Sequence, residues 1–393
     1  MSIYFIGLLI TLLIVRLFST INLKNFLIQF IASSCCAIPL AVIAGLRTTV
    51  IGTDLQTYGI YCFNLARNYD QFSPYYNYLK NTVKTEYGYD LLNYCVSRLS
   101  GNINIFLFIL SLFTLIPFFM GAFNIKKDYQ ISVVLQTIFY FSMFYGYSLN
   151  LLRQSVAISW GFLSLTLLFK KKNVNFLKAC IPLIVAVSFH STAFILIIIL
   201  EAYYYFSIDR NLPLSSIKKM LFRIIFFIEI IGLVLFSNGL INSLFSKYDQ
   251  YFNGSNNTLA SQTNVFLTPL GFSIIPIYAL MVLTFLNKNA DHGNVILDNT
   301  QASIRTSILM TWKVILILAI CFSWGGLYGA MLARIGLYFM AFESYILPFS
   351  LKYTNLNISK IMLYTVFGIY YLSMFAFFTY IGSNSIFPYQ WIF

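Results

Sequence analysis

Long apolar stretches separated by short polar segments recur from one end of this chain to the other. A helix needs roughly 17–25 apolar residues to cross a bilayer, and many of these stretches have that length. The strict apolar–polar alternation of membrane β-barrel strands is not the dominant pattern. The pattern therefore predicts an all-α, polytopic integral membrane protein of GT-C-like architecture. It has about ten full spans, at approximately 3–21, 26–46, 103–123, 131–149, 152–169, 222–240, 265–286, 306–326, 335–351 and 358–381.

The apolar segment 176–206 does not fit a simple span. It is too long for one straight crossing and too short for two, because legs of about 15 residues reach only about 22 Å. It holds Pro182 and, near its middle, His190. If the segment enters and returns, most of the 25 basic residues fall on one side, whereas a single crossing lowers that count. We therefore expect a bent or re-entrant hairpin with His190 near an outward-facing tip.

Two long polar segments interrupt the expected single transmembrane domain, 1–393, and both face outside in this topology. The first, about 47–101, is too long for a mere connector and is rich in tyrosine. Within it, Leu55, Tyr58, Cys62 and Leu65 recur at helical spacing, which predicts an amphipathic helix over 54–68 on the membrane surface. The second, about 241–264, is rich in Asn and Ser and is typical of a flexible, lid-like segment.

The composition agrees with a membrane protein. Charged residues make up 9% of the chain and apolar residues 59%, where a soluble domain carries about 25% charged residues. The net charge of +13 comes from short basic clusters between apolar segments, so it indicates orientation and not a nucleic-acid partner. The first residues contain neither a basic region nor a small-residue cleavage site, which favours a retained first span over a signal peptide.

Several chemistries lack their sequence motifs here. The chain contains no GxxxxGK[ST] loop, no GxGxxG motif after a strand, no HExxH motif and no His/Cys cluster with metal-ligand spacing. We therefore expect no metal and no cofactor, and a substrate that arrives already activated or is transported without a nucleotide.

Three arginines at expected outer helix ends are the main candidates for binding a phosphate group. Arg47 closes one span, Arg153 opens another after Asn150, and Arg334 opens a third. A guanidinium beside a helix N-terminus suits a pyrophosphate through its fork geometry and the helix dipole. The alternative is interfacial snorkelling. Gln154 shares the helical face of Asn150 and Arg153, and Tyr338 lies one turn from Arg334.

Acid–base candidates lie in the same outer regions. His190, in VSFHSTAF, is a candidate general base or phosphate contact, and the alternative is a hydrogen-bonded structural histidine. Asp54 and Glu86 are each placed to deprotonate a sugar hydroxyl or to pair with an arginine. Loop tyrosines, among them Tyr58, suit stacking on sugar rings, although an interfacial aromatic belt explains many of them equally well.

These residues carry a family resemblance. In chain order, GLRTTVIGTDLQTY, EYGYDLL, LNLLRQSVA, SFHSTAF, ARIGLYF and a terminal PYQW resemble the EpsG family, whose role is similar to that of Wzy-type polysaccharide polymerases. The resemblance runs from about Gly45 to the C-terminus. Each string is weak by itself, and their order and placement between spans make the match specific.

The resemblance implies a membrane glycosyltransferase of the bacterial cytoplasmic membrane with an outward-facing site. Such an enzyme polymerises exopolysaccharide, capsule or O-antigen repeat units. It moves the growing glycan from undecaprenyl pyrophosphate to the non-reducing end of a new lipid-linked repeat unit. The partners implied are these two lipid-linked glycans, membrane lipid and a chain-length regulator. By position the family's arginines are Arg47, Arg153 and Arg334, its acids Asp54 and Glu86, and its histidine His190. A flippase for lipid-linked oligosaccharide and a glycan ligase are the alternatives.

Overall fold

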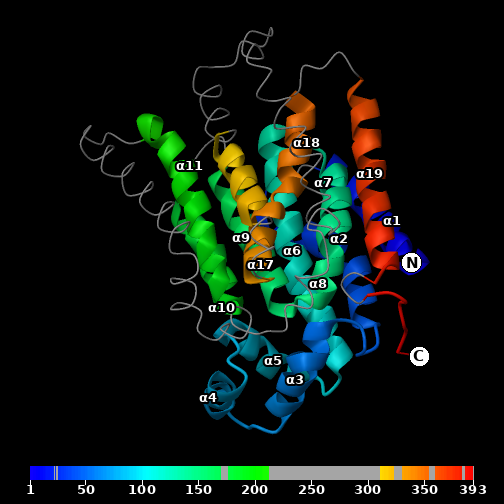
Figure 1. Cartoon of the computed structure of the whole chain (residues 1–393), viewed down its shortest axis with the longest axis vertical. Helices are drawn as coiled ribbons and strands as arrows, with labels where there is room; N and C mark the ends of the chain where they lie inside the picture. The colour runs from blue at the N-terminus through cyan, green and yellow to red at the C-terminus, as the bar shows by residue number, and fades with distance from the viewer. Residues whose placement is uncertain are drawn as a thin grey trace. The chain divides into compact units, whose positions relative to one another are not determined.

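The computed structural model describes residues 1–169 apart from 22 and 24, and then 176–211, 310–322, 330–353, 359–382 and 386–392. Helices make up the regular structure of these residues, with one isolated β-bridge between Arg47 and Trp391 (Figure 1). The all-α prediction is therefore confirmed. The predicted spans 222–240 and 265–286 and the predicted loop 241–264 lie outside the described residues.

The chain divides into two compact units. The first comprises Met1–Ala193 together with Glu343–Phe393, and the second comprises Phe194–Phe342.

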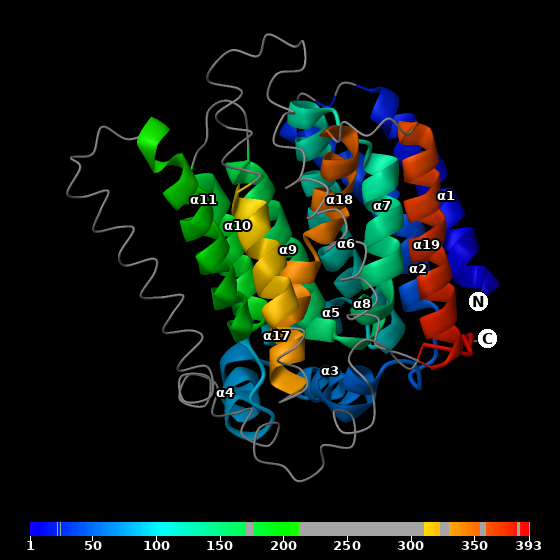
Figure 2. The ribbon, with the colours of Figure 1, turned by 45° about the horizontal axis from the view of Figure 1, so that its top comes forward.

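A helical bundle forms most of the first unit (Figure 2). In it, α2 packs along α6, α6 along α9 and α9 along α10, while α19 lies beside α7. The bundle helices are α1 (Ser2–Thr20), α2 (Phe26–Gly45), α6 (Ile103–Tyr129), α7 (Val133–Tyr140), α8 (Gly146–Asn150), α9 (Leu152–Leu168), α10 (Phe176–Phe189), α18 (Glu343–Tyr353) and α19 (Lys360–Tyr380).

Four of the described helices, namely α1, α2, α6 and α19, are long and apolar enough to cross a membrane. Their exposed side chains are largely aliphatic and aromatic, as for Leu9, Leu13 and Ile361, which lie 60%, 60% and 77% exposed. A lipid environment removes the cost of exposing such surface to water. The first unit is thus membrane-embedded, while the total of about ten spans stays a prediction.

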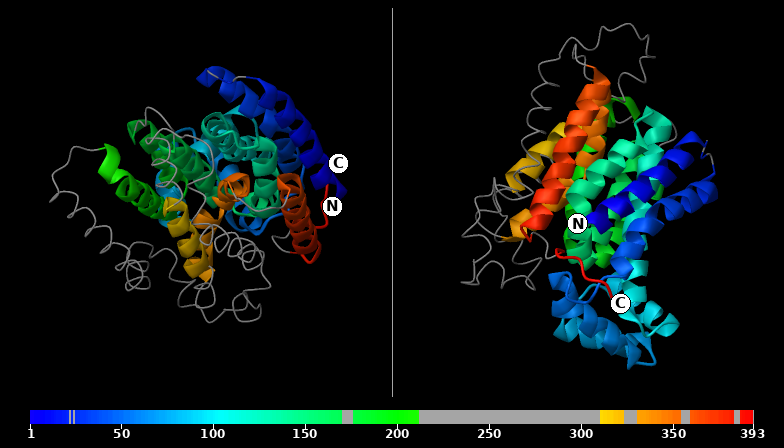
Figure 3. Two further views of the ribbon diagram at one scale, coloured as in Figure 1. Left: turned by 90° about the horizontal axis from the view of Figure 1, so that it is seen from above. Right: turned by 90° about the vertical axis from the view of Figure 1, so that its right-hand side faces the viewer.

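Residues 47–101 form a helical cap at one end of this bundle, below it in the right-hand view of Figure 3. The cap contains the π-helical turn η1 (Leu55–Gly59), α3 (Ile60–Arg67), α4 (Phe72–Thr82) and α5 (Tyr87–Leu99). Its helices enclose a small core that includes Cys62, Phe63, Tyr75 and Leu79, each fully buried. The helix predicted over 54–68 is confirmed as η1 followed by α3, while its position on the membrane surface stays a prediction.

Two breaks in the bundle helices lie near the cap. The predicted span 131–149 is α7, a second π-helical turn (η2, Phe141–Tyr145) and α8, which ends at Asn150. Leu151 then leaves helical geometry, with φ −87° and ψ 79°, and α9 begins at Leu152. The second break is at His190, between α10 and the 3₁₀ turn η3 (Ser191–Ile195). Side chains at both breaks face the start of α5.

Lysines gather at the end of the bundle opposite the cap. α6 starts next to the cap, and its 27 residues extend about 40 Å. At its far end Lys126 Nζ donates to the carbonyl oxygen of Ser19, and Lys352 Nζ donates to that of Tyr129 at 2.7 Å. Lys360 Nζ in turn donates to the Lys352 carbonyl at 2.7 Å.

The C-terminal segment pairs with the residues that follow α2. Thr48 N donates to the Gln390 carbonyl at 3.0 Å, and Ile392 N donates to the Leu46 carbonyl at 3.2 Å. Tyr389 adds a bond from its hydroxyl to the Ile43 carbonyl at 2.8 Å. These contacts join the last residues of the chain to the segment that enters the cap.

The described helices of the second unit are α11 (Leu196–Asn211), a helix over Met310–Phe322 and α17 (Ala330–Met340). Phe322 and Phe339 stack with their ring centroids 5.5 Å apart, which joins the last two. The break at His190 falls where the sequence predicts the tip of a hairpin; because α11 belongs to the second unit, the return of 176–206 stays a prediction.

Candidate functional site

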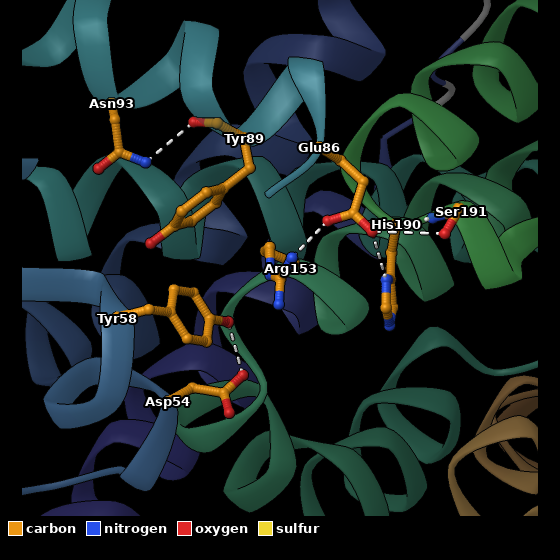
Figure 4. Close-up of polar contacts among 8 residues, drawn as sticks. All are labelled: Asp54, Tyr58, Glu86, Tyr89, Asn93, Arg153, His190 and Ser191. Atoms are coloured by element: carbon orange, nitrogen blue, oxygen red, sulfur yellow. Dashed lines mark hydrogen bonds and ion pairs between the residues drawn. The ribbon is translucent and has the colours of Figure 1, made fainter. Parts of the chain in front are cut away.

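Glu86, at the start of α5 in the cap, contacts two side chains of the bundle, Arg153 and His190 (Figure 4). Its backbone is extended (φ −90°, ψ 150°) and its carboxylate does not cap α5, so the side chain reaches toward the bundle. One oxygen, Oε2, lies 2.5 Å from Nη1 of Arg153, and the other, Oε1, lies 3.2 Å from Nδ1 of His190. The carboxylate is 8% exposed, so this bridge lies in a largely dry environment where charge interactions are strong.

Gly88 permits this approach of α5 to the end of α10. A Cβ at this position would lie 2.5 Å from Oγ of Ser188 and 2.9 Å from the Ser188 carbonyl oxygen. Both distances are shorter than van der Waals contact, and the densely packed neighbours have little room to move aside. The glycine in EYGYD therefore determines how near Glu86 comes to His190.

Arg153 lies in the first turn of α9, immediately after the break at Leu151. Its guanidinium bonds Glu86 on one side and lies over the Tyr58 ring on the other, 4.5 Å from the ring centroid. A cation over an aromatic face is attracted by the ring quadrupole. Two different cap elements, η1 and the start of α5, thus fix one guanidinium.

His190 occupies the break between α10 and η3 and is buried. The Ser191 backbone N–H and its hydroxyl both lie 3.4 Å from the same Glu86 oxygen that faces His190. An ionised carboxylate only accepts hydrogen bonds, so Glu86 favours the His190 tautomer in which Nδ1 carries the proton. In that tautomer Nε2, which points away from Glu86, is the basic nitrogen.

Asp54 and Tyr58 form the cap side of the cluster. The Tyr58 hydroxyl donates to Oδ2 of Asp54 at 2.7 Å. Burial, and then the Asp54 charge, raises the pKa of Tyr58 well above its ordinary value, while the Arg153 charge lowers it. Tyr58 therefore stays a protonated donor at neutral pH, and its ring remains a neutral face for Arg153.

Gly52 and Asn150 attach this part of the cap to the bundle. Gly52 has φ +97°, and a Cβ there would lie 2.7 Å from the Leu149 carbonyl oxygen, so both the backbone angle and the space require glycine. Asn150 Oδ1 accepts bonds from the backbone N–H and the hydroxyl of Thr53, both at 2.8 Å. Asn150 thus positions the segment that carries Asp54.

Arg47 belongs to the same attachment. Its side chain is 1% exposed, and Nη1 donates to the Leu149 carbonyl at 2.5 Å. The carbonyl that Gly52 approaches is therefore held by Arg47. Among the expected phosphate-binding arginines, the structure brings Arg153 to the Glu86 cluster and places Arg47 in this buried contact.

Three expected site residues remain, namely Gln154, Arg334 and Tyr338. Gln154 is buried in the first turn of α9. Arg334 and Tyr338 lie in α17, in the second unit, so their convergence with Arg153 stays a prediction.

Sequence reasoning did not single out Ser191 or Gly88 as parts of the site. Ser191 directly follows the histidine, and Gly88 lies in the quoted EYGYD string. Their neighbours were the available signal, but the contacts depend on how α5 meets α10. In the described part of the chain, no group of three or more His, Cys, Asp or Glu side chains is arranged to hold a metal ion.

Comparison with known proteins identifies a family. The model of the EpsG family, a family of Wzy-type polymerases, matches residues 30–391, nearly the whole chain. No curated protein and no solved structure matches.

Proposed function

This chain belongs to the EpsG family, and we propose that it is a membrane glycosyltransferase that polymerises repeat units linked to undecaprenyl pyrophosphate. It transfers the growing glycan to the non-reducing end of a new lipid-linked repeat unit, at the outer face of the bacterial cytoplasmic membrane. Family membership supports the polysaccharide polymerase class. The observation that supports this site most directly is the Glu86 carboxylate, which bridges Arg153 and His190 at the cap end of the bundle.

The transfer makes one bond and breaks one. A hydroxyl oxygen of the acceptor sugar attacks the anomeric carbon of the donor glycan, the bond from that carbon to the pyrophosphate oxygen breaks, and undecaprenyl pyrophosphate leaves. The hydroxyl proton passes to Nε2 of His190. Glu86, on Nδ1, orients the ring and stabilises the imidazolium that forms, as a carboxylate does in hydrolase triads.

Arg153 suits the leaving pyrophosphate. Negative charge grows on the leaving oxygens as the glycosidic bond breaks, and a guanidinium already fixed by Glu86 and Tyr58 stabilises that charge without having to reorganise. The Arg153–Glu86 pair carries no net charge, so the protonated His190 supplies the additional positive charge late in the reaction. Arg334 remains a further candidate for the pyrophosphate.

The proposed orientation of the protein in the membrane is based on the positions of three lysines. Lys126, Lys352 and Lys360 gather at the end of the bundle opposite the cap. Basic residues are in excess on the cytoplasmic side of membrane proteins. The cap and the Glu86 cluster then face the outer side, where flipped lipid-linked repeat units are available.

Reconstitution tests the proposal. The purified chain in liposomes receives a lipid-linked repeat unit, and a ladder of products with increasing numbers of repeats is expected. A Glu86→Gln variant in the same liposomes should give little or no ladder. Movement of the lipid across the bilayer without any product would instead identify a flippase. Transfer of one unit to a different acceptor, without a ladder, would identify a ligase.

A further inference from the structure

Two exposed tyrosines meet on the outer face of the cap. Tyr61 on α3 is 45% exposed and Tyr78 on α4 is 40% exposed, and their hydroxyl oxygens lie 3.1 Å apart. The Tyr69 ring backs Tyr78, with the ring centroids 6.4 Å apart. This contact links the two tyrosines through their hydroxyl ends and restrains both rings at a surface where large side chains are usually free to move.

Exposed amide side chains lie near both tyrosines in the sequence of the cap helices. Asn64 lies one turn beyond Tyr61 on α3, and Asn81 lies one turn beyond Tyr78 on α4. Asn68, the C-cap residue of α3, and Asn77, which adjoins Tyr78, are exposed as well. Amides offer both donors and acceptors to hydroxyl groups, and aromatic faces pack against the C–H faces of sugar rings. Uncharged donors, acceptors and aromatic faces are together complementary to an uncharged, hydroxyl-rich chain.

The tyrosine pair is connected to the candidate site along one helical segment. Asp54 and Tyr58 precede Tyr61 in the run formed by η1 and α3, and Tyr61 lies about one turn beyond Tyr58. From Asp54 to Asn68 this run covers about 20 Å at the rise of an α-helix. A glycan whose reacting end lies at His190 and Arg153 is therefore able to continue along the same helix to Tyr61 and Tyr78.

We propose that Tyr61 and Tyr78, with Asn64, Asn68, Asn77 and Asn81, form a glycan-binding subsite that holds uncharged sugars of the chain away from the reacting end. The subsite rests on the proposed function in that its ligand is the glycan of that reaction. It is separate from the pyrophosphate contacts. Its ligand is the sugar chain itself, with neither lipid nor phosphate attached.

The test uses the full-length protein in nanodiscs free of substrate lipid. The probe is a set of oligosaccharides of increasing length, cut by partial hydrolysis from the surface polysaccharide of the source cell. Their binding is measured by calorimetry and by ligand-observed NMR.

The wild type should bind these oligosaccharides, and its affinity should increase with their length. Tyr61→Ala/Tyr78→Ala should bind at least about tenfold more weakly, because two ring faces are lost. Tyr61→Phe/Tyr78→Phe keeps both ring faces but loses the hydroxyl contact that restrains them, so its affinity should lie between those of the wild type and the double alanine variant.

Two matched variants make the result specific. Tyr380→Ala removes an exposed tyrosine at the end of α19, outside the cap segment 47–101, and should leave binding unchanged. Arg153→Ala should also retain oligosaccharide binding, although we expect it to lose polymerisation.

Two results would overturn the subsite, namely absence of binding by the wild type and equal affinity of the wild type and the double alanine variant. The second result would indicate tyrosines that anchor the cap at the membrane interface. Binding without any polymerisation by the wild type would uphold the subsite and contradict the proposed reaction.

Discussion

Oε2 of Glu86 lies 2.5 Å from Nη1 of Arg153, and this ion pair joins the start of α5 to the start of α9. Because the other oxygen of the same carboxylate faces His190, one acidic residue determines the position of both the proposed pyrophosphate-binding cation and the candidate base. The pair connects residues 67 positions apart in sequence. A change at Glu86 should therefore affect leaving-group binding and proton transfer together.

Glu86→Gln should lower the polymerisation rate about 10²–10³-fold, a typical share for a correctly positioned acid–base group. Glutamine keeps the shape, but it lacks the charge that holds Arg153 and stabilises a protonated His190. The initial rate of ladder formation measures the loss. Asp70→Asn, at an exposed acid of the same cap, is the matched control and should retain activity. A near-normal rate for Glu86→Gln would show that the bridge is only structural.

Tyr58 has two separable contacts, so two substitutions divide its role. Tyr58→Phe removes the hydrogen bond to Asp54 and keeps the ring under Arg153, whereas Tyr58→Leu removes both. A cation–π contact contributes about 0.5–2 kcal/mol. We therefore expect the leucine variant to be inhibited more weakly by added inorganic pyrophosphate than the phenylalanine variant. Equal inhibition constants for the two variants would show that the ring does not position Arg153.

Helical periodicity and apolar length were sufficient for the all-α fold, for α1, α2, α9 and α19 within a few residues, and for the helix at 54–68. They did not place the end of α6, which lies six residues beyond the predicted span 103–123. The predicted span 335–351 is wrong as a single helix, because the turn at Ala341 and Phe342 separates α17 from α18. Motif order was sufficient for the family. The Glu86 bridge was not predictable in the same way: the sequence left open whether this carboxylate pairs with an arginine or acts on a hydroxyl. Which partner it meets depends on the break at Leu151 and the close packing at Gly88, and neither leaves a periodic signal.

Arg47 shows the same limit. Its position after α2 is equally typical of a phosphate ligand and of a buried structural arginine. The choice depends on the Leu149 carbonyl, about a hundred residues away, and on pairing with the C-terminal segment. Long-range contacts of this kind depend on the assembled bundle and have no local sequence signature.

Gly88→Ala should reduce activity strongly, because the added methyl group overlaps backbone and side-chain atoms of Ser188 and pushes Glu86 away from His190. Overpacking of this kind typically costs about 1–3 kcal/mol. Gly368→Ala is a matched control in another helix, where a Cβ meets nothing within 4 Å. Polymerisation rate and unfolding temperature, measured on both variants, test the prediction. Equal activity of the two would contradict the packing argument.

Arg47→Met should lower the unfolding temperature, because the Leu149 carbonyl loses a buried charged donor, a loss of about 1–3 kcal/mol. The fraction that remains folded should keep the wild-type inhibition constant for inorganic pyrophosphate. Arg153→Met should weaken that inhibition. If Arg47→Met weakened pyrophosphate inhibition as much as Arg153→Met, Arg47 would have to contact the leaving group directly.

Cys95 should react readily with a thiol reagent, and Cys62 should not. Cys95 is exposed on α5, whereas Cys62 is fully buried in the cap core, so the two thiols of this segment differ although the sequence treats them alike. Burial raises the pKa of the Cys62 thiol from 9.0 to about 12. The reactive thiolate at Cys62 is therefore scarce at about pH 8.

The same pKa shift makes the stability of the cap depend on pH. Because the pKa of Cys62 is higher in the folded protein than in the unfolded chain, the stability gained by burying the neutral thiol is fully present below 9.0, the pKa of the unfolded chain. It is lost progressively as the pH rises from 9.0 to about 12, because the thiol of the unfolded chain ionises first in that range.

The same pair of cysteines reports which side of the membrane the cap faces. A membrane-impermeant maleimide added outside intact cells at about pH 8 should label the wild type and the Cys62→Ser variant equally. Cys95→Ser gives the background from the other thiols, among them the exposed Cys321. Cys62 should become reactive only after the protein is unfolded in denaturant. If Cys95 is labelled only after the membrane is permeabilised, the cap faces the cytoplasm. The lysine-rich end would then lie outside, and the Glu86 cluster could not meet repeat units at the outer face.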